Sequence, residues 1–288
     1  MERELIIVLG PTGAGKTDFA IREALRYDSP VISCDSRQLF KEMSIGTAVP
    51  SRKQLAAVKH YFIQDHSIHD NYSAGDYERE ALDLIDRLFD EGHEKLVMCG
   101  GSMMYIEAVC NGLDDFPDIP MELRAHLLEC LKDEGLDTLV SQLKELDPET
   151  AGTIDLSNPQ RVVRALEVCI YTGESFSSFK THASRERNFK ITKLGITHPR
   201  EILYERIERR VDIMIARGLE REARGLIQWR DLPALQTVGY REMFNYFDHA
   251  TTFDRTVEFI KRNTRHYAKR QLTWWKRETD IKWIEPES

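Results

Sequence analysis

The sequence predicts an α/β fold in which a doubly wound parallel sheet carries an inserted all-helical subdomain. Over most of the chain, short apolar runs typical of buried strands alternate with amphipathic helical patterns. This alternation favours parallel strands joined by crossover helices. Between about residues 114 and 183 the strand pattern stops and only helical patterns occur. The 288 residues are sufficient for one large domain with such an insertion.

The predicted elements follow one another in a regular order. We expect strands at 5–9, 30–34, 61–64, 95–99, 190–197 and 281–284, with helices at 16–26, 52–58, 74–91 and 103–109. Further helices at 121–134, 136–146, 148–154 and 159–171 precede a polar, basic stretch at 175–188. The expected domains are therefore a catalytic core, 1–116 and 184–288, and a helical insertion, 117–183. Such an insertion is suited to closing over a substrate.

A phosphate-binding loop follows the first predicted strand. The segment Gly10-Pro11-Thr12-Gly13-Ala14-Gly15-Lys16-Thr17 matches the pattern G-x-x-x-x-G-K-[ST]. The glycines allow the backbone N–H groups to converge on phosphate oxygens beside the positive end of the next helix. Lys16 supplies a mobile positive charge, and the Thr17 hydroxyl is placed to bind Mg²⁺. We predict that the chain binds a polyphosphate or pyrophosphate group through these eight residues.

Polar residues also follow two other predicted strands. Asp35 comes after the apolar run that ends at Cys34, and Ser102 follows Gly100 and Gly101 after the strand at 95–99. Ligands bind at the carboxyl ends of strands in such sheets. Asp35 could organise Mg²⁺, act as a base, or cap a following helix. The turn at Ser102 could approach a ligand closely, and a helix start capped by Ser102 is nearly as plausible.

Composition restricts the partners and the compartment. The net charge of −8 argues mildly against a nucleic-acid partner, but residues 255–277 contain eight Lys or Arg and one Glu, interleaved with aromatics. This mixture suits RNA phosphates and bases, and a solvated helix face packed by its Trp residues is equally plausible. The five cysteines show no metal-binding spacing, and no apolar run approaches 18 residues. We expect a cytoplasmic protein without a signal peptide or membrane span.

Several of these stretches together carry a resemblance to a known family. Besides 10–17, they are Asp35-Ser36-Arg37-Gln38, Ile45-Gly46-Thr47-Ala48, Gly100-Gly101-Ser102, Asn158-Pro159-Gln160-Arg161, Val238-Gly239-Tyr240-Arg241 and Lys269-Arg270-Gln271. In this order they resemble the tRNA dimethylallyltransferase family, also called the IPP transferase family, from Ile6 to about Trp283. Two residues depart from the pattern, because the family usually has Thr at the position of Ser102 and Tyr at that of Phe40.

The resemblance implies a P-loop NTPase-like fold and a prenyl transfer. A dimethylallyl group would pass from dimethylallyl diphosphate to N6 of adenosine 37 in the anticodon loop of tRNA. The phosphate loop, with Mg²⁺ on Thr17, would stabilise the leaving pyrophosphate. The expected catalytic residues are Asp35, which accepts the proton of the amine, Ser102, and Arg210, which reaches the pyrophosphate. The adenine would be flipped out of the loop to reach them.

The resemblance also implies the residues that contact the anticodon stem-loop. They are Asp35, Ser36, Arg37, Gln38, Ser102, Arg124, Gln160, Arg161, Val162, Val163, Arg164, Gln236, Thr237, Val238, Gly239, Tyr240 and Arg241. Taken alone, Arg161 and Arg164 would usually be surface charge on one helical face, and Arg210 could form an ion pair along its helix.

Other functions remain open at this point. An isopentenyltransferase acting on free AMP or ADP shares the phosphate loop and the Asp-Ser pattern. A P-loop kinase of a small metabolite, or a non-catalytic RNA-binding protein, fits the loop alone. The helical insertion and the basic segment favour tRNA as the acceptor. No Cys follows Cys169, so we expect a bacterial-type enzyme without a carboxyl-terminal zinc finger, working as a monomer.

Overall fold

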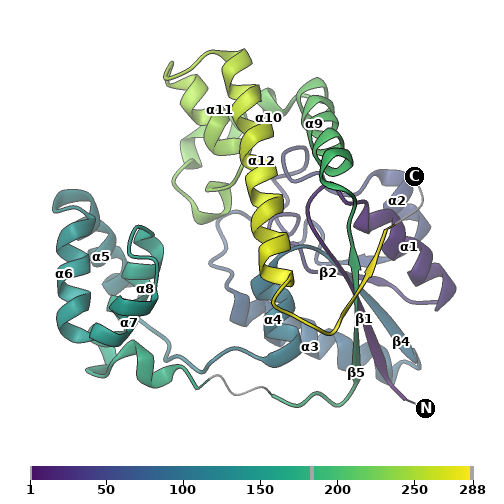
Figure 1. The fold of residues 1–288 in the computed structure, drawn as a ribbon, viewed down its shortest axis with the longest axis horizontal. Coiled ribbons are helices and arrows are strands. Elements are labelled where there is room, and N and C mark those ends of the chain that lie inside the picture. Colours follow the sequence, from purple (N-terminus) through teal and green to yellow (C-terminus); the bar gives the residue numbers. More distant parts are fainter. Residues whose placement is uncertain (1, 182–184, 286–288) are drawn as a thin grey trace. The chain divides into compact units, whose positions relative to one another are not determined.

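The computed structural model describes residues 2–181 and 185–285 and divides into two compact units. The first, here called the core unit, comprises Met1–Cys110 and Glu186–Ser288, and the second, the helical unit, comprises Asn111–Arg185 (Figure 1). The sequence places the corresponding boundaries at 117 and 183, six residues after the start of the helical unit and two before its end. Among the described residues, no helix is long and apolar enough to cross a membrane.

The core unit contains a six-stranded sheet, and all of its strand pairs are parallel. Its order is β3-β2-β4-β1-β5-β6, in which the strands are β1 (Glu4–Leu9), β2 (Val31–Ser33), β3 (His60–Tyr61), β4 (Lys95–Cys99), β5 (Lys190–Ile196) and β6 (Ile281–Ile284). The predicted α/β fold is therefore confirmed. Because β1 lies between β4 and β5, and β2 borders β4, the carboxyl ends of β1, β2 and β4 are neighbours.

Apolar residues cover both faces of this sheet. Along β1, Leu5, Ile7 and Leu9 belong to one buried cluster and Val8 belongs to another. A parallel sheet covered by helices on both faces requires such continuous apolar strands. β3 is shorter than the predicted strand at 61–64, because Phe62 and Gln64 adopt left-handed backbone conformations that end the strand.

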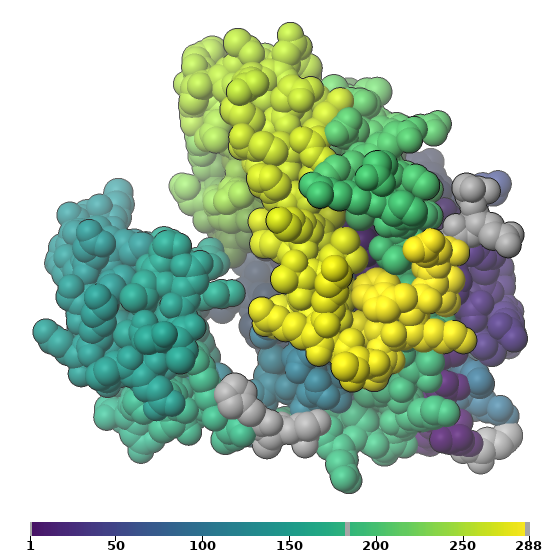
Figure 2. All heavy atoms as spheres, viewed as in Figure 1, coloured from purple at the N-terminus to yellow at the C-terminus, as the bar shows by residue number. Residues whose placement is uncertain are grey.

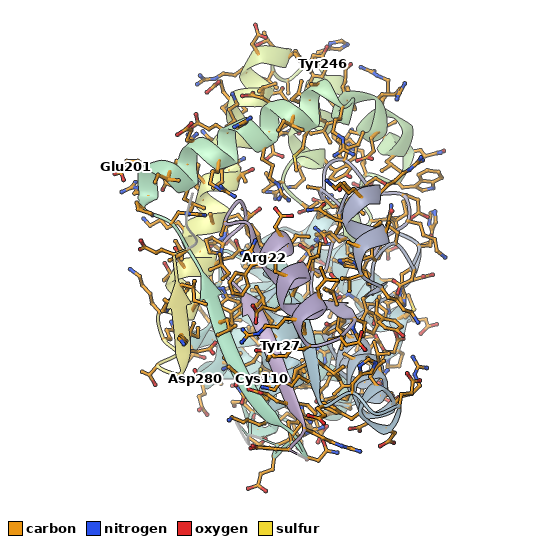
Figure 3. The ribbon with its side chains drawn as sticks, turned by 90° about the vertical axis from the view of Figure 1, so that its right-hand side faces the viewer. Arg22, Tyr27, Cys110, Glu201, Tyr246 and Asp280 are labelled. Carbon is orange, nitrogen blue, oxygen red and sulfur yellow. The ribbon has the colours of Figure 1, made fainter. Side chains whose placement is uncertain are left out.

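Helices surround the sheet and extend above its carboxyl edge. Around the sheet lie α1 (Lys16–Arg26), α2 (Arg52–Ala57), α3 (Ala74–Asp90) and α4 (Met103–Asn111); the later helices are α9 (Arg200–Ala216), α10 (Leu219–Leu226), α11 (Tyr240–Phe247) and α12 (Phe253–Trp275). Figure 3 shows α9, whose first turn is marked by Glu201, lying across the end of the sheet from which α1 descends past Arg22 and Tyr27. Helices from the last third of the chain therefore cover the carboxyl edge of the sheet (Figure 3).

The helical unit is a small bundle with its own core. It consists of α5 (Met121–Asp133), α6 (Leu136–Leu146), α7 (Pro148–Thr153), α8 (Pro159–Thr172) and a 3₁₀ turn, η1 (Phe176–Phe179). Leu127, Leu143 and Leu166 are buried between these helices. The side chain of Asn158 caps α8 by accepting the N–H groups of Gln160 and Arg161. The start of α8 is therefore held rigidly by its own sequence.

Candidate active site

The phosphate loop connects β1 to α1 and adopts a conformation that its glycines require. Gly10, Gly13 and Gly15 all have positive φ angles. A Cβ atom on Gly10 would lie 2.2 Å from the carbonyl oxygen of Ile196, so no larger residue fits there. The Lys16 Nζ donates to the carbonyl of Pro11 at 2.8 Å. The lysine is therefore folded over its own loop, with the positive end of α1 directly behind it.

Lys16 and Thr17 line a cavity of about 480 Å³, here called the loop cavity. Desolvation lowers the pKa of the half-buried Lys16 ammonium, and the nearby guanidinium of Arg210 lowers it further. Within residues 2–181 and 185–285, no cluster of three or more His, Cys, Asp or Glu could hold a metal ion. Thr17 also lines the cavity, and its hydroxyl is an oxygen ligand of a kind that Mg²⁺ accepts.

Asp35 lies just beyond the end of β2, and its carboxylate holds the turn that follows. Its Oδ1 atom accepts the backbone N–H groups of Arg37 at 2.9 Å and Gln38 at 3.3 Å. These bonds hold a turn, whereas the sequence suggested a cap for a following helix; the next helix, α2, begins only at Arg52. Both of these bonds use Oδ1, and the residue also lines the loop cavity. One carboxylate oxygen thus anchors the turn while the other remains available to a ligand.

Ser102 connects the turn after β4 to the turn after β2. It lines neither the loop cavity nor the second cavity beside it, which is described next. Its Oγ accepts the N–H of Ser36 at 2.8 Å and lies 3.1 Å from the Ser36 hydroxyl. The Ser102 side chain is buried, with 8% of the residue exposed. Its hydroxyl thus positions the turn after Asp35, and a direct contact with a ligand would require this pair of hydroxyls to rearrange.

A second cavity of about 370 Å³, here called the side cavity, adjoins the loop cavity. The side cavity is lined by Arg37, Gly46 and the loop from Gln236 to Gly239, together with Arg241. Four residues line both cavities: Thr12, Asp35, Arg210 and Tyr267. The two cavities therefore meet at the Asp35 carboxylate and the Arg210 guanidinium.

Arginines from α9 make the loop cavity strongly positive. Arg206, Arg209 and Arg210 line it, followed by Arg217 just after the helix. The Arg206 Nε donates to the carbonyl of Gly13 at 2.8 Å, directly on the phosphate loop. Desolvation lowers the pKa of Arg210, whereas the Asp35 carboxylate raises it. Such a cluster of cations around a glycine-rich loop is suited to a ligand with several negative charges.

The segment Ile45-Gly46-Thr47-Ala48 is held by a carboxylate that the sequence did not single out. Glu222, on α10, accepts the N–H groups of Ser44, Ile45 and Gly46 at 2.8–3.1 Å and the Tyr240 hydroxyl at 2.6 Å. The carbonyl of Thr47 in turn accepts weak bonds from Gln38 Nε2 and Arg210 Nη2, at 3.2 and 3.5 Å. Glu222 therefore orders the 44–48 loop, whose Thr47 carbonyl contacts Arg210 between the two cavities.

The 236–241 loop contains both buried and exposed residues. Arg37 donates to the carbonyls of Pro233 and Ala234, which lie just before this loop. These bonds hold the start of the loop next to the turn after Asp35. Tyr240 is fully buried, and its hydroxyl is bound to Glu222. The exposed residues of the loop are Gln236 and Arg241. The Tyr240 side chain therefore supports the loop from inside, whereas Gln236 and Arg241 are available to a ligand.

The basic segment at 255–277 contains both residues that pack on the core unit and residues that are exposed. Lys261 and Arg265 form ion pairs with Asp212 and Glu208 of α9, at 2.7 and 2.6 Å, and Trp275 is completely buried. Other basic residues on α12 and just after it are exposed; they are Arg255, Arg262, Lys269, Arg270, Lys276 and Arg277. Figure 2 shows the side chains of α12, in yellow, along one face of the molecule.

Two predicted RNA-binding arginines of the helical unit converge on a buried carboxylate. Arg164 and Arg124 lie 2.6 and 3.4 Å from Oε1 of Glu167, whose side chain is 2% exposed. The Arg164 guanidinium also stacks over the ring of Phe116 at 5.3 Å. Arg161, one turn earlier, is exposed. The side chains of Val162 and Val163 are buried in the core of the bundle, where they position the helix that carries these arginines.

Comparison with known proteins identifies the family. The model of the IPP transferase family matches residues 38–278. The chain is 49% identical to a tRNA dimethylallyltransferase of Christiangramia forsetii, covering 99% of this chain and 94% of that protein. It is 45% identical to tRNA dimethylallyltransferase 1 of Bacteroides thetaiotaomicron, covering 98% and 92%. The chain belongs to the IPP transferase family.

Two solved structures extend the comparison. A tRNA isopentenylpyrophosphate transferase of Bacillus halodurans aligns with a TM-score of 0.71 and 32% identity, over 99% of this chain and 90% of that one. A eukaryotic dimethylallyltransferase acting on tRNA aligns with a TM-score of 0.80 over 98% of this chain and 74% of that one. Its 23% identity shows a shared fold only. The resemblance to the IPP transferase family is therefore confirmed.

In this IPP transferase family member, the structure gathers the phosphate loop, Asp35, Arg210 and the 236–241 loop around two adjoining cavities. Arg124, Gln160, Arg161 and Arg164 belong to the separate helical unit. Sequence reasoning missed Arg206, Arg209 and Arg217, although their spacing from Arg210 places them near one face of a helix. It also missed Glu222, for which no local pattern was available, and it noted Tyr267 only as one of the aromatics among the basic residues at 255–277.

Proposed function

We propose that the chain transfers a dimethylallyl group from dimethylallyl diphosphate to N6 of adenosine 37 in the anticodon loop of tRNA, releasing diphosphate. The observation that carries this proposal is the junction of two cavities at Asp35 and Arg210. One cavity contains a phosphate loop, as a diphosphate donor requires, and the other provides space for the acceptor. The names of the relatives, tRNA dimethylallyltransferases at 45–49% identity, support the same reaction.

The donor diphosphate would occupy the loop cavity. As the carbon–oxygen bond of the donor breaks, negative charge accumulates on the leaving diphosphate. Lys16, Arg206 and Arg210 surround this position, and the first turn of α1 presents its N–H groups to it. Mg²⁺, bound through Thr17, would neutralise part of the same charge. These side chains therefore stabilise the diphosphate more strongly in the transition state, in which its negative charge has grown, than in the bound donor.

The acceptor adenine would enter the side cavity. The amine at N6 is a weak nucleophile because its lone pair is delocalised into the ring. As N6 forms its bond to the allyl carbon, its surplus proton passes to the free oxygen of Asp35. The other oxygen keeps its bonds to Arg37 and Gln38, so the carboxylate stays in place during the transfer. A positioned base of this kind contributes typically about 10²–10⁴-fold to a rate.

The remainder of the anticodon stem-loop would be bound by exposed residues around the two cavities and on the helical unit. We assign this role to Gln236, Arg241, Arg161 and Gln160, and to the exposed basic residues of α12. Lys269 and Arg270 on α12 are exposed next to Tyr267, which lines both cavities. Phosphate contacts of this kind fix the position of the RNA, whereas specificity requires contacts with the bases.

The proposed enzyme acts as a monomer in the cytoplasm. All five cysteines are free thiols, as is usual in a reducing compartment. The test is to incubate the protein with labelled dimethylallyl diphosphate, Mg²⁺ and either tRNA, AMP or ATP. Label in tRNA alone supports the proposal. Label in AMP would indicate an enzyme acting on free nucleotides, and no labelled acceptor would refute prenyl transfer.

A further inference from the structure

Gln271, on α12, lies between the phosphate loop and the turn that follows β4. The residue is 2% exposed. Its Oε1 accepts the backbone N–H of Thr12 at 2.9 Å, and its Nε2 donates to the carbonyl of Gly101 at 2.8 Å. Both polar atoms of the buried amide are therefore bound to backbone groups of two different segments. A single side chain thus connects three parts of the chain that are far apart in the sequence.

Contacts around Gly101 show how closely these segments approach one another. A Cβ atom on Gly101 would lie 2.4 Å from Nε2 of Gln271 and 3.5 Å from Nζ of Lys16. The turn therefore needs glycine because the glutamine amide occupies the space beside it. The bond to Gln271 also occupies the N–H of Thr12, so this N–H is not available to a phosphate oxygen.

The position of Gln271 on α12 connects it to both cavities. Gln271 lines the loop cavity, whereas Thr264 and Arg270, on the same helix, line the side cavity, and Tyr267 lines both. A helix is a rigid element, so a change in its position moves these side chains together. The helix that borders the acceptor therefore also contacts the phosphate loop and the Gly101 turn, which follow the directly paired strands β1 and β4.

We propose that Gln271 is a positioning residue for the donor. Its amide holds the Thr12 part of the phosphate loop to the Gly101 turn, so that Lys16 and the remaining loop N–H groups surround the diphosphate in their binding geometry. This inference rests on the proposed function only in identifying the diphosphate as part of dimethylallyl diphosphate. Gln271 does not itself touch the reacting atoms, because both of its polar atoms are bound to backbone.

The test compares Gln271→Met, which keeps the size of the side chain and removes both hydrogen bonds, with Gln142→Met on an exposed site of α6. Binding of inorganic diphosphate with Mg²⁺ is measured by calorimetry. We expect the Kd to rise about tenfold in Gln271→Met, the scale of one or two lost hydrogen bonds, and to stay unchanged in the control. Gln271→Asn, which retains an amide too short to span the gap, should weaken binding similarly and serves if the Met variant does not fold.

Steady-state transfer supplies the second measurement. The KM for dimethylallyl diphosphate should rise in the Gln271 variants, whereas the KM for tRNA stays within about twofold. A merely structural role would lower the thermal midpoint or the active fraction and leave both the diphosphate Kd and the donor KM unchanged. That result would overturn the inference. Absence of transfer by the wild-type protein would refute the proposed function instead, while the diphosphate Kd would still decide the role of Gln271.

Discussion

Two arginines of α8, one turn apart, should separate RNA binding from structural support. Arg161 is exposed, whereas Arg164 lies 2.6 Å from the buried Glu167 carboxylate and over the Phe116 ring. We therefore expect Arg161→Ala to weaken tRNA binding and Arg164→Ala to destabilise the protein. The two substitutions are matched, because they remove the same side chain from the same helix.

The size of the stability effect follows from the surroundings of Glu167. Its Oε2 atom is buried without a hydrogen-bond partner, and without Arg164 only Arg124, at 3.4 Å, remains near Oε1. Removing one partner of a buried ion pair costs about 3–5 kcal/mol. Because the Arg164 side chain is 38% exposed, water reduces this cost, and we expect a loss of about 2 kcal/mol of unfolding free energy. For Arg161→Ala the change should stay within about 0.5 kcal/mol.

The assay measures binding of a labelled anticodon stem-loop at several salt concentrations, with chemical denaturation on the same preparations. If Arg161 neutralises one phosphate, its loss should reduce the slope of log K against log salt by about 0.7–0.9. Arg164→Ala should leave this slope unchanged. As a control, the stability cost of Arg164→Ala should fall below about 1 kcal/mol when Glu167 is also replaced by Gln. A reduced slope without a loss of stability in Arg164→Ala would refute the reasoning.

Three further outcomes are expected. Lys16→Ala should abolish transfer while tRNA binding largely survives, because the ammonium acts on the diphosphate; wild-type transfer by this variant would exclude the phosphate loop as the donor site. Asp35→Asn should lower the single-turnover rate by at least about 10²-fold, whereas an unchanged rate would limit Asp35 to capping its turn. Glu222→Gln replaces an acceptor oxygen with an amino group facing backbone N–H groups, so it should cost about 2 kcal/mol or more in denaturation experiments and raise the KM for tRNA. Unchanged stability and KM in that variant would show that Glu222 does not order the 44–48 loop.

The sequence by itself determined the sheet and the position of the phosphate loop. The order of strands and helices indicated a parallel sheet, and the segment 10–17 identified the phosphate loop. Asp35 and Lys16 could be expected near one another because each follows a strand of the same parallel sheet. These features depend on local patterns and on a general rule of topology, so a single sequence is sufficient for them.

Only the tertiary structure decided which side chains the polar groups bind. Ser102 was expected at a ligand, and its hydroxyl is bound to Ser36; Arg164 was expected on RNA, and its guanidinium is bound to Glu167. Gln271 reaches the phosphate loop across 259 positions of the chain, a distance at which no spacing pattern exists. Buried polar groups take whichever partners the packing of distant segments brings within hydrogen-bond distance, because leaving them unpaired costs more than any local preference.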